Sequence, residues 1–174
     1  MDKKLPVINS DRLILREFEE NDAHYMFINW ANNAENSKYT NMKVADSENN
    51  CRTGIDLWKN YYDKGLFMWA ICLKISNEPI GMIGFELSEN PEISFTVGKK
   101  YNNRGYATEA LAAALRFGIK ELGAKRFWGY HFTENIASGR VMQKAGMAHI
   151  RSDIKYNRFF NKDMPIEIYE YCTR

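Results

Sequence analysis

One segment constrains the fold of this chain more than any other: residues 106–122 carry apolar side chains at the period of an α-helix. Their spacings are four, four and three residues, at Leu111, Leu115, Ile119 and Leu122. Alanines between them favour helix, Gly123 is placed to end it, and Glu109 in the first turn is expected to tie the helix to a sheet. Strand-like runs at 92–98 and 126–132 flank the helix, which predicts a right-handed crossover between two parallel strands.

The rest of the chain has the patterns of further strands and helices. We expect a strand at 12–18, helices at 21–32 and 46–65, meander strands at 67–74, 79–87 and 92–98, a short helix at 135–144, and final strands at 148–159 and 166–172. Short turns in the meander require antiparallel neighbours, whereas the crossover requires a parallel pair. The expected fold class is α/β, with a mixed, mostly antiparallel central sheet and flanking helices in a single domain covering residues 1–174.

Length, charge and cysteine content exclude several classes of protein. A chain of 174 residues that is 45% hydrophobic buries a core without disulfides, and a net charge of +2 gives no reason to expect a nucleic-acid partner. The longest apolar run, at 66–73, is too short to cross a membrane, and the first residues lack the apolar stretch of a secretory signal. Cys51, Cys72 and Cys172 are odd in number and widely spaced, so we expect free thiols, no metal site and a cytoplasmic protein.

The loop that leads into the long helix carries the clearest chemical signal. A helix start leaves backbone N–H groups unpaired, and Gly105 and Ala107 let a ligand approach them closely. Lys99, Lys100 and Arg104 add positive charge. These features favour an anion site, such as one for a pyrophosphate; the alternative is an ordinary glycine-containing turn with solvated lysines. The loop matches neither the nucleotide-binding P-loop nor the dinucleotide-binding G-x-G-x-x-G motif.

Several short motifs, in their order and spacing, resemble a known family. They are SDRLILR at 10–16, PIGMIG at 79–84, EISF at 92–95, GYATEAL at 105–111, ENIAS at 134–138 and KAG at 144–146. Together they resemble the GNAT superfamily of acetyl-CoA-dependent N-acetyltransferases, and within it the ribosomal-protein-alanine (RimJ/RimL-like) branch, over nearly the whole chain. The resemblance implies acetyl-CoA as co-substrate, acetyl transfer to a primary amine, a pair of strands that splay apart to hold acetyl-CoA, and a homodimer.

The resemblance also implies which residues hold acetyl-CoA. The loop of the family reads Q/R-x-x-G-x-G/A, and this chain has NNRGYA at 102–107, so Asn102 departs from the first position while the backbone cradle is kept. In the family, the asparagine at the start of the last helix contacts the pantetheine arm; Asn135 stands there and also suits an N-cap. The implied cofactor-binding residues are Phe95, Thr96, Val97, Asn102, Asn103, Arg104, Gly105, Tyr106, Ala107, Thr108, Asn135 and Ser138.

Two residues are candidates for the chemistry. Glu92 shares the polar face of its strand with Ser94 and Thr96, and in the resembling branch this face lines the acceptor cleft. Glu92 is therefore the candidate general base, acting directly or through water; the alternative is a solvent-facing glutamate. The family often has a tyrosine acid four residues beyond Ser138, but Met142 stands there, so Ser138 becomes the group expected to stabilise the departing thiolate. The oxyanion donor is expected to be a backbone N–H at 95–97.

The acceptor amine stays open at this stage. By resemblance it is the α-amino group of a protein N-terminus or, second, a small amine. Tyr39 and Trp58 lie in the segment in which the family varies, and they are candidates to line the acceptor site. A peptide needs an open groove, whereas a polycation favours acidic walls. The rival function is a non-catalytic acyl-CoA-binding or regulatory module, which the missing tyrosine keeps open.

Overall fold

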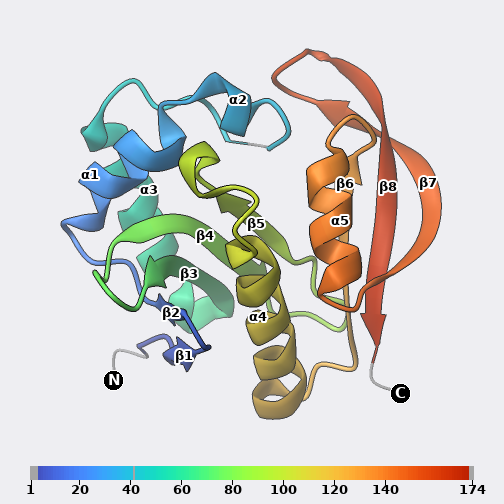
Figure 1. The fold of residues 1–174 in the computed structure, drawn as a ribbon, viewed down its shortest axis with the longest axis horizontal. Coiled ribbons are helices and arrows are strands. Elements are labelled where there is room, and N and C mark those ends of the chain that lie inside the picture. The colour runs from blue at the N-terminus through green and yellow to red at the C-terminus, as the bar shows by residue number, and fades with distance from the viewer. Residues whose placement is uncertain (1–3, 41, 173–174) are drawn as a thin grey trace.

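The computed structural model describes residues 4–40 and 42–172, and its ribbon is shown in Figure 1. The strands are β1 (Ile8–Asn9), β2 (Leu13–Arg16), β3 (Leu66–Leu73), β4 (Pro79–Glu86), β5 (Ser94–Val97), β6 (Arg126–Phe132), β7 (Ala148–Asn157) and β8 (Lys162–Cys172). The α-helices are α1 (Asp22–Met26), α2 (Ala34–Ser37), α3 (Glu48–Lys59), α4 (Tyr106–Leu122) and α5 (Ile136–Lys144). A π-helical turn lies at Phe27–Ala31, and 3₁₀ turns lie at Tyr62–Lys64 and Lys99–Tyr101.

The strands form two antiparallel sheets that are joined at one point. β1 to β5 pair in chain order, and β8 lies between β6 and β7 in the second sheet. A parallel bridge between Glu92 and Trp128 links the two sheets, and there the N–H of Ile93 donates to the carbonyl of Trp128 at 2.8 Å. β5 and β6 are not paired beyond this bridge. The expected α/β class with mostly antiparallel strands is confirmed, and the parallel pair is limited to the residues before β5.

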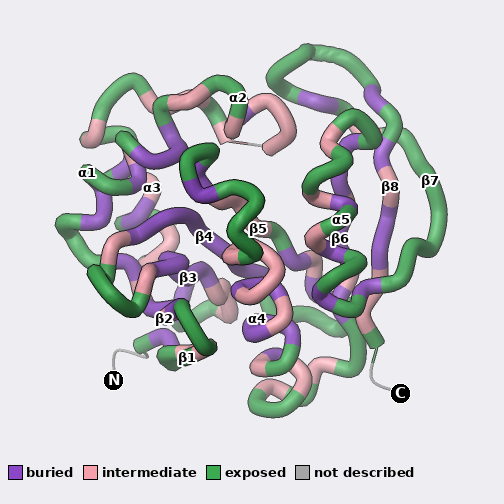
Figure 2. Tube along the Cα trace, in the orientation of Figure 1, coloured by how far each residue is buried: buried purple, intermediate pink, exposed green. Residues whose placement is uncertain are grey.

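The helices cover these sheets on both sides. α4 packs against β1, β2, β4 and β5, whereas α1 packs against β4 and α3. α5 packs against β6 and β7 and also contacts α4. Figure 2 shows that the central strands β3 and β4 are buried, while the edge strand β7 is exposed along most of its length. In the described residues, no helix is both long enough and apolar enough to span a bilayer.

Helix α4 has the bounds that the apolar period predicts. Leu111 and Leu115 are fully buried, and the small side chains of Ala110 and Ala114 let the helix lie close to the sheet. The helix is bounded by two residues in the left-handed conformation, Gly105 with φ +80° and Gly123 with φ +70°. A side chain is strained at such angles, so the two glycines fix where the helix begins and ends.

Three other expected elements differ in their bounds, and one further helix was not expected. The helix expected at 46–65 ends at Lys59 and is followed by a separate 3₁₀ turn; its start is capped by Ser47, which accepts from the N–H of Asn50 at 3.4 Å. The strand expected at 12–18 is shorter, and the helix expected at 21–32 ends at Met26 and continues as the π-helical turn. α2 was not expected; Asn33 caps it.

The strands that flank the crossover also differ in length. β5 begins at Ser94 rather than at residue 92, because the preceding backbone pairs with β6 through Pro91, Ile93 and Trp128. The strand expected at 166–172 begins earlier, at Lys162, since the chain turns back at once after β7 and pairs from Asn157 onward. β7 and β8 therefore form a long hairpin that extends beyond the rest of the second sheet (Figure 1).

Candidate active site

A cavity of about 930 Å³ is lined by β5, by the starts of α4 and α5, by β6, and by residues from 35–40 together with Met42. The predicted residues that line it are Glu92, Phe95, Thr96, Val97, Asn102, Asn103, Gly105, Tyr106, Ala107, Thr108, Asn135 and Ser138. Both candidates for the acceptor site, Tyr39 and Trp58, line it as well. The fold thus gathers residues from distant parts of the sequence around the gap between β5 and β6.

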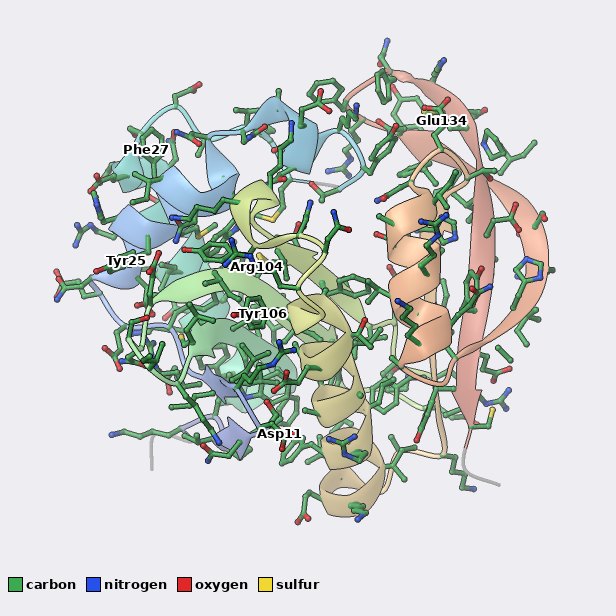
Figure 3. The ribbon with its side chains drawn as sticks, in the orientation of Figure 1. Asp11, Tyr25, Phe27, Arg104, Tyr106 and Glu134 are labelled. Carbon is green, nitrogen blue, oxygen red and sulfur yellow. The ribbon has the colours of Figure 1, made fainter. Side chains whose placement is uncertain are left out.

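Arg104 is the one predicted cofactor residue that does not line this cavity. It is exposed, and its backbone carbonyl accepts a hydrogen bond from Arg12 Nη1 at 2.9 Å. Figure 3 shows Arg104 and Tyr106 at the N-terminal end of α4. Arg104 therefore stays a prediction as a cofactor residue: its backbone carbonyl helps to fix the loop, and the residue does not line the cavity.

The loop before α4 presents main-chain donors to the cavity. The first intrahelical bond runs from the N–H of Glu109 to the carbonyl of Gly105 at 3.0 Å, and no side chain caps the helix. The N–H groups of the first turn are thereby left for a ligand. Asn103, with φ +61°, and Gly105 are both left-handed, a conformation that turns successive N–H groups toward one concave side. This geometry suits an anion such as a diphosphate.

A clamp of charged side chains, formed by Arg12 and Glu109, fixes this loop to the start of β2. Glu109 accepts from the backbone N–H of Arg12 at 2.7 Å, from its Nε at 2.8 Å and from the hydroxyl of Ser10 at 2.7 Å. The Arg12 guanidinium also lies 4.7 Å from the ring centroid of Tyr106. Burial opposes ionisation of Glu109, but these hydrogen bonds hold its pKa below the ordinary value. The expected tie between helix and sheet is present, and Arg12 neutralises the carboxylate beside the proposed diphosphate site.

The free edge of β5 turns backbone groups toward the gap. The N–H of Ile93 donates to β6, and the N–H of Gly98 donates to the carbonyl of Ile80 in β4 at 2.8 Å. Backbone groups alternate in direction along a strand, so those of Phe95 and Val97 point the same way as Ile93, away from β4. The N–H groups of these two residues are therefore the ones directed toward the gap, within the range expected for an oxyanion donor.

Glu92 lies at the point where the two sheets separate. Its backbone forms the parallel bridge, which fixes the residue, and its side chain is half-buried in the cavity wall. Within the described residues, its carboxylate has no hydrogen-bond or ion-pair partner. A carboxylate held on a rigid strand and free of partners is available to accept a proton.

Asn135 and Ser138 form a local pair at the start of α5. Asn135 Oδ1 accepts from the backbone N–H of Ser138 at 3.4 Å, so Asn135 is the N-cap. Asn135 Nδ2 donates to Ser138 Oγ at 3.0 Å. Because the Ser138 oxygen accepts this hydrogen bond, its own proton is free to be donated into the cavity.

The close packing of α5 against β6 depends on Gly139. A Cβ at Gly139 would lie 2.5 Å from Nε2 of His131, which is 7% exposed and stacks beside Tyr169. His131 Nδ1 lies 2.9 Å from the carbonyl of Phe132, while Nε2 has no partner within the described residues. The glycine lets the helix approach β6 closely enough for Ser138 to reach the cavity.

Some lining residues were not anticipated from the sequence. Arg140 and Lys144 line the cavity from α5, where a spacing of four places them on one face of the helix. Two basic residues at this spacing, directly after the motif that contains Asn135, are the sequence signal from which Arg140 and Lys144 could have been predicted to line the cavity. Tyr130 of β6 and Glu134 of the following loop also line it; Glu134 begins the ENIAS motif at 134–138, whereas no motif marks Tyr130.

Comparisons with known proteins agree with this geometry. A family model described as "Acetyltransferase (GNAT) domain" matches residues 12–148. The uncharacterized N-acetyltransferase YnaD of Bacillus subtilis is 30% identical over 161 residues, which cover 91% of this chain and 88% of YnaD. A GNAT-family acetyltransferase from Bacillus anthracis is 26% identical with a TM-score of 0.85, over 96% of this chain and 98% of that one.

A further likeness is of fold alone. The structure of RimL, a ribosomal L7/L12 α-N-protein acetyltransferase in complex with coenzyme A, has a TM-score of 0.83 at 17% identity, over 96% of this chain and 98% of that one. The family model covers most of the chain, and YnaD matches it almost throughout. This chain belongs to the GNAT acetyltransferase family.

Proposed function

We propose that this protein transfers an acetyl group from acetyl-CoA directly to a primary amine. The observation that carries the proposal is that one cavity is lined by the donor loop before α4, by Glu92 and by Ser138. Such a reaction needs a neutral nucleophile, stabilisation of an oxyanion and help for the leaving thiolate, and the cavity offers a candidate for each. Family membership and the coenzyme A bound by RimL support acetyl-CoA as the donor.

The proposed reaction begins with loss of a proton from the acceptor ammonium. Glu92 takes this proton, directly or through a water molecule, and the amine lone pair attacks the thioester carbonyl. A C–N bond forms, and the negative charge on the former carbonyl oxygen is stabilised by N–H groups of Phe95 and Val97. When the C–S bond breaks, coenzyme A leaves as a thiolate that accepts a hydrogen bond from Ser138, and the second proton lost by the former amine nitrogen converts this thiolate to the thiol. The products are an amide and free coenzyme A.

The binding roles follow from the same cavity. The N–H groups at the start of α4 hold the diphosphate, and Asn135 positions the pantetheine arm beside Ser138. Lys99, Arg140 and Lys144 line the same cavity and supply positive charge for the phosphates. A covalent acetyl-cysteine route is disfavoured, since neither Cys51 nor Cys72 lines the cavity. Burial also raises the pKa of Cys51 to about 11 and that of Cys72 to about 12, so both stay as thiols.

An acceptor screen that detects thiol release tests this proposal. The purified chain is incubated with acetyl-CoA and a panel of primary amines, and amine-free samples correct for hydrolysis of the thioester. We expect release of coenzyme A that requires an amine and yields the N-acetyl product by mass spectrometry. Binding of acetyl-CoA without turnover on any amine would instead support the non-catalytic module.

A further inference from the structure

A second connection between the two halves of the fold lies in the wall of the cavity. The hydroxyl of Tyr39, in the segment after α2, donates to Glu134 Oε2 at 3.1 Å. Glu134 lies in the loop between β6 and α5. Figure 3 labels Glu134 near the end of α5 that faces α2. The two residues are 95 positions apart in sequence and belong to the opposite halves of the fold. We refer to Lys38 and Tyr39, with their contacts to the second sheet, as the Tyr39 bridge.

The Tyr39 bridge has contacts besides this hydrogen bond. Asn157, which is 1% exposed at the end of β7, donates from Nδ2 to the carbonyl of Lys38 at 2.9 Å. The Tyr39 ring lies 6.2 Å from the ring of Phe132 and 6.3 Å from that of Phe160. Lys38 and Tyr39 are thus contacted by β6, by the β7–β8 hairpin and by the β6–α5 loop. The bridge is therefore a fixed part of the cavity wall.

This bridge limits what can reach the base. Tyr39 and Glu134 line the same cavity as Glu92 and Ser138, so an acceptor that binds at Glu92 shares this cavity with the bridge. A polypeptide N-terminus brings its following residues into the same opening and needs a groove that continues outward. The crossing at Tyr39 interrupts such a groove, whereas a small molecule fits wholly inside the cavity.

The charges of the lining also restrict the acceptor. Three glutamates line the cavity, and two of them have partners: Glu35 pairs with Lys38 at 2.9 Å, and Glu134 accepts from Tyr39. The hydrogen bond from Lys38 lowers the pKa of Glu35, while burial and the bond to Glu134 raise the pKa of Tyr39. Within the described residues, Glu92 alone of these glutamates has no partner. One such carboxylate suits an acceptor with one ammonium group better than a polycation.

The remaining walls suit an apolar body. Thioether and aromatic side chains adapt well to apolar ligands of varied shape. Such side chains that line the cavity outside the donor loop include Met42, Trp58, Met68, Met82 and Tyr130.

The geometry points to a small primary monoamine with a compact apolar body as the acceptor, bound in the cavity whose wall the Tyr39 bridge closes. This inference rests on the proposed acetyltransferase function and narrows it. It favours the small-amine alternative over a protein N-terminus.

Three acceptors of defined chemistry test the inference: 2-phenylethylamine, spermidine and a hexapeptide that begins with alanine. For the unaltered protein we expect kcat/KM for 2-phenylethylamine to exceed that for each of the other two at least about tenfold, the scale of discrimination that an apolar pocket provides. The hexapeptide is excluded by the bridge, and spermidine must bury a second ammonium without a partner.

Variants of Tyr39 distinguish the contribution of the bridge to acceptor selectivity from that of the other cavity residues. Tyr39→Phe keeps the ring and removes the hydrogen bond to Glu134, whereas Tyr39→Ala removes the crossing. We expect the ratio of kcat/KM for the peptide to that for 2-phenylethylamine to rise about tenfold in Tyr39→Ala and less in Tyr39→Phe. Tyr25→Ala is the matched control, because Tyr25 is an exposed tyrosine of α1 that does not line the cavity. Calorimetry with acetyl-CoA verifies that each variant is folded.

The outcomes distinguish this inference from the function on which it rests. Efficient acetylation of the peptide by the unaltered protein, or an unchanged ratio in Tyr39→Ala, would overturn the inference and leave the acetyltransferase function intact. Binding of acetyl-CoA with no turnover of any of the three amines, or of the wider panel, would overturn both.

Discussion

The two ends of the cavity are built in different ways. The end proposed to bind acetyl-CoA, called the donor end, is made of main-chain N–H groups at the start of α4, locked in place by the clamp between Arg12 and Glu109. The end proposed to bind the amine, called the acceptor end, is made of side chains from separate segments, which meet through contacts such as Tyr39 with Glu134. The donor end therefore tolerates changes of side chain as long as its backbone conformation is kept. The acceptor end depends on the identity of each side chain, which is how one fold serves many acceptors.

The largest expected effect on kcat is that of substituting Glu92, which lies where the donor end meets the acceptor end. Glu92→Gln keeps the shape of the side chain and removes the base, so we expect kcat to fall by about 10²- to 10⁴-fold with the affinity for acetyl-CoA unchanged. Steady-state kinetics and calorimetry measure the two quantities. Glu89→Gln, at an exposed glutamate outside the cavity lining, is the matched control. Equal activity of the Glu92 and Glu89 variants would remove Glu92 from the mechanism.

At the donor end, we expect backbone strain to weaken the binding of acetyl-CoA. Gly105→Ala forces a side chain into a left-handed conformation at a cost of about 1–2 kcal/mol, which predicts a loss of acetyl-CoA affinity of roughly five- to thirtyfold. Gly123→Ala imposes the same strain at the other end of α4, where a Cβ meets nothing within 4 Å. Calorimetry should show weaker binding only in the Gly105 variant. Equal losses in both variants would mean that general destabilisation, and not the loop, is being measured.

The clamp links the donor end to the start of β2, and its loss should mainly weaken binding. Arg12→Ala leaves the Glu109 carboxylate unneutralised beside the diphosphate site, so we expect the KM for acetyl-CoA to rise about tenfold with a smaller change in kcat. Arg12→Lys should recover part of the affinity. Arg52→Ala, which removes an exposed ion pair with Glu20, serves as the control. A fall in kcat with an unchanged KM would contradict a positioning role.

The clamp also makes a prediction about pH. Since the pKa of Glu109 is lowered in the folded state, its contribution to stability is present at neutral pH and is lost as the pH falls through that lowered pKa. Thermal unfolding of the unaltered chain and of Glu109→Gln should therefore differ at pH 7 and converge in acid. A difference that grows as the pH falls would contradict this assignment.

The smallest expected effect is at Ser138. Removing a hydrogen bond to the leaving thiolate is worth about 0.5–1.5 kcal/mol, so Ser138→Ala should lower kcat by roughly two- to twelvefold. The loss should be smaller for thioesters whose thiols are more acidic, because they need less help to leave. Ser152→Ala, at an exposed serine of β7, is the control. A loss that is the same for all thioesters would assign Ser138 a role in binding alone.

The contrast between the two ends also explains what could be predicted from the sequence. The helical period and the glycines at both ends of α4 are local signals, and they predicted this helix with its correct bounds. Arg104, a basic residue in such a loop, stays a predicted phosphate ligand; the hydrogen bond from Arg12 to its backbone carbonyl joins positions 92 apart in sequence, which no local pattern indicates. Likewise, β5 proved shorter than its pattern because pairing with Trp128 removed its first residues.

The acceptor end was the least predictable part. α2 spans only Ala34–Ser37 and carries no periodic pattern, so nothing in the sequence indicated that Tyr39 would reach Glu134. The position of β8 was also missed at its start, and with it the hairpin whose Phe160 packs beside Tyr39. Contacts of this kind depend on tertiary packing over about a hundred residues of sequence, which local patterns do not encode.

A calorimetric titration with acetyl-CoA tests the central claim most directly, because it requires no knowledge of the acceptor. We expect saturable one-to-one binding by the unaltered chain, weakened by Gly105→Ala and unaffected by Glu92→Gln. Absence of binding heat at several temperatures, or binding of equal strength in the Gly105 variant, would contradict the assignment of the loop before α4 as the site that holds the diphosphate.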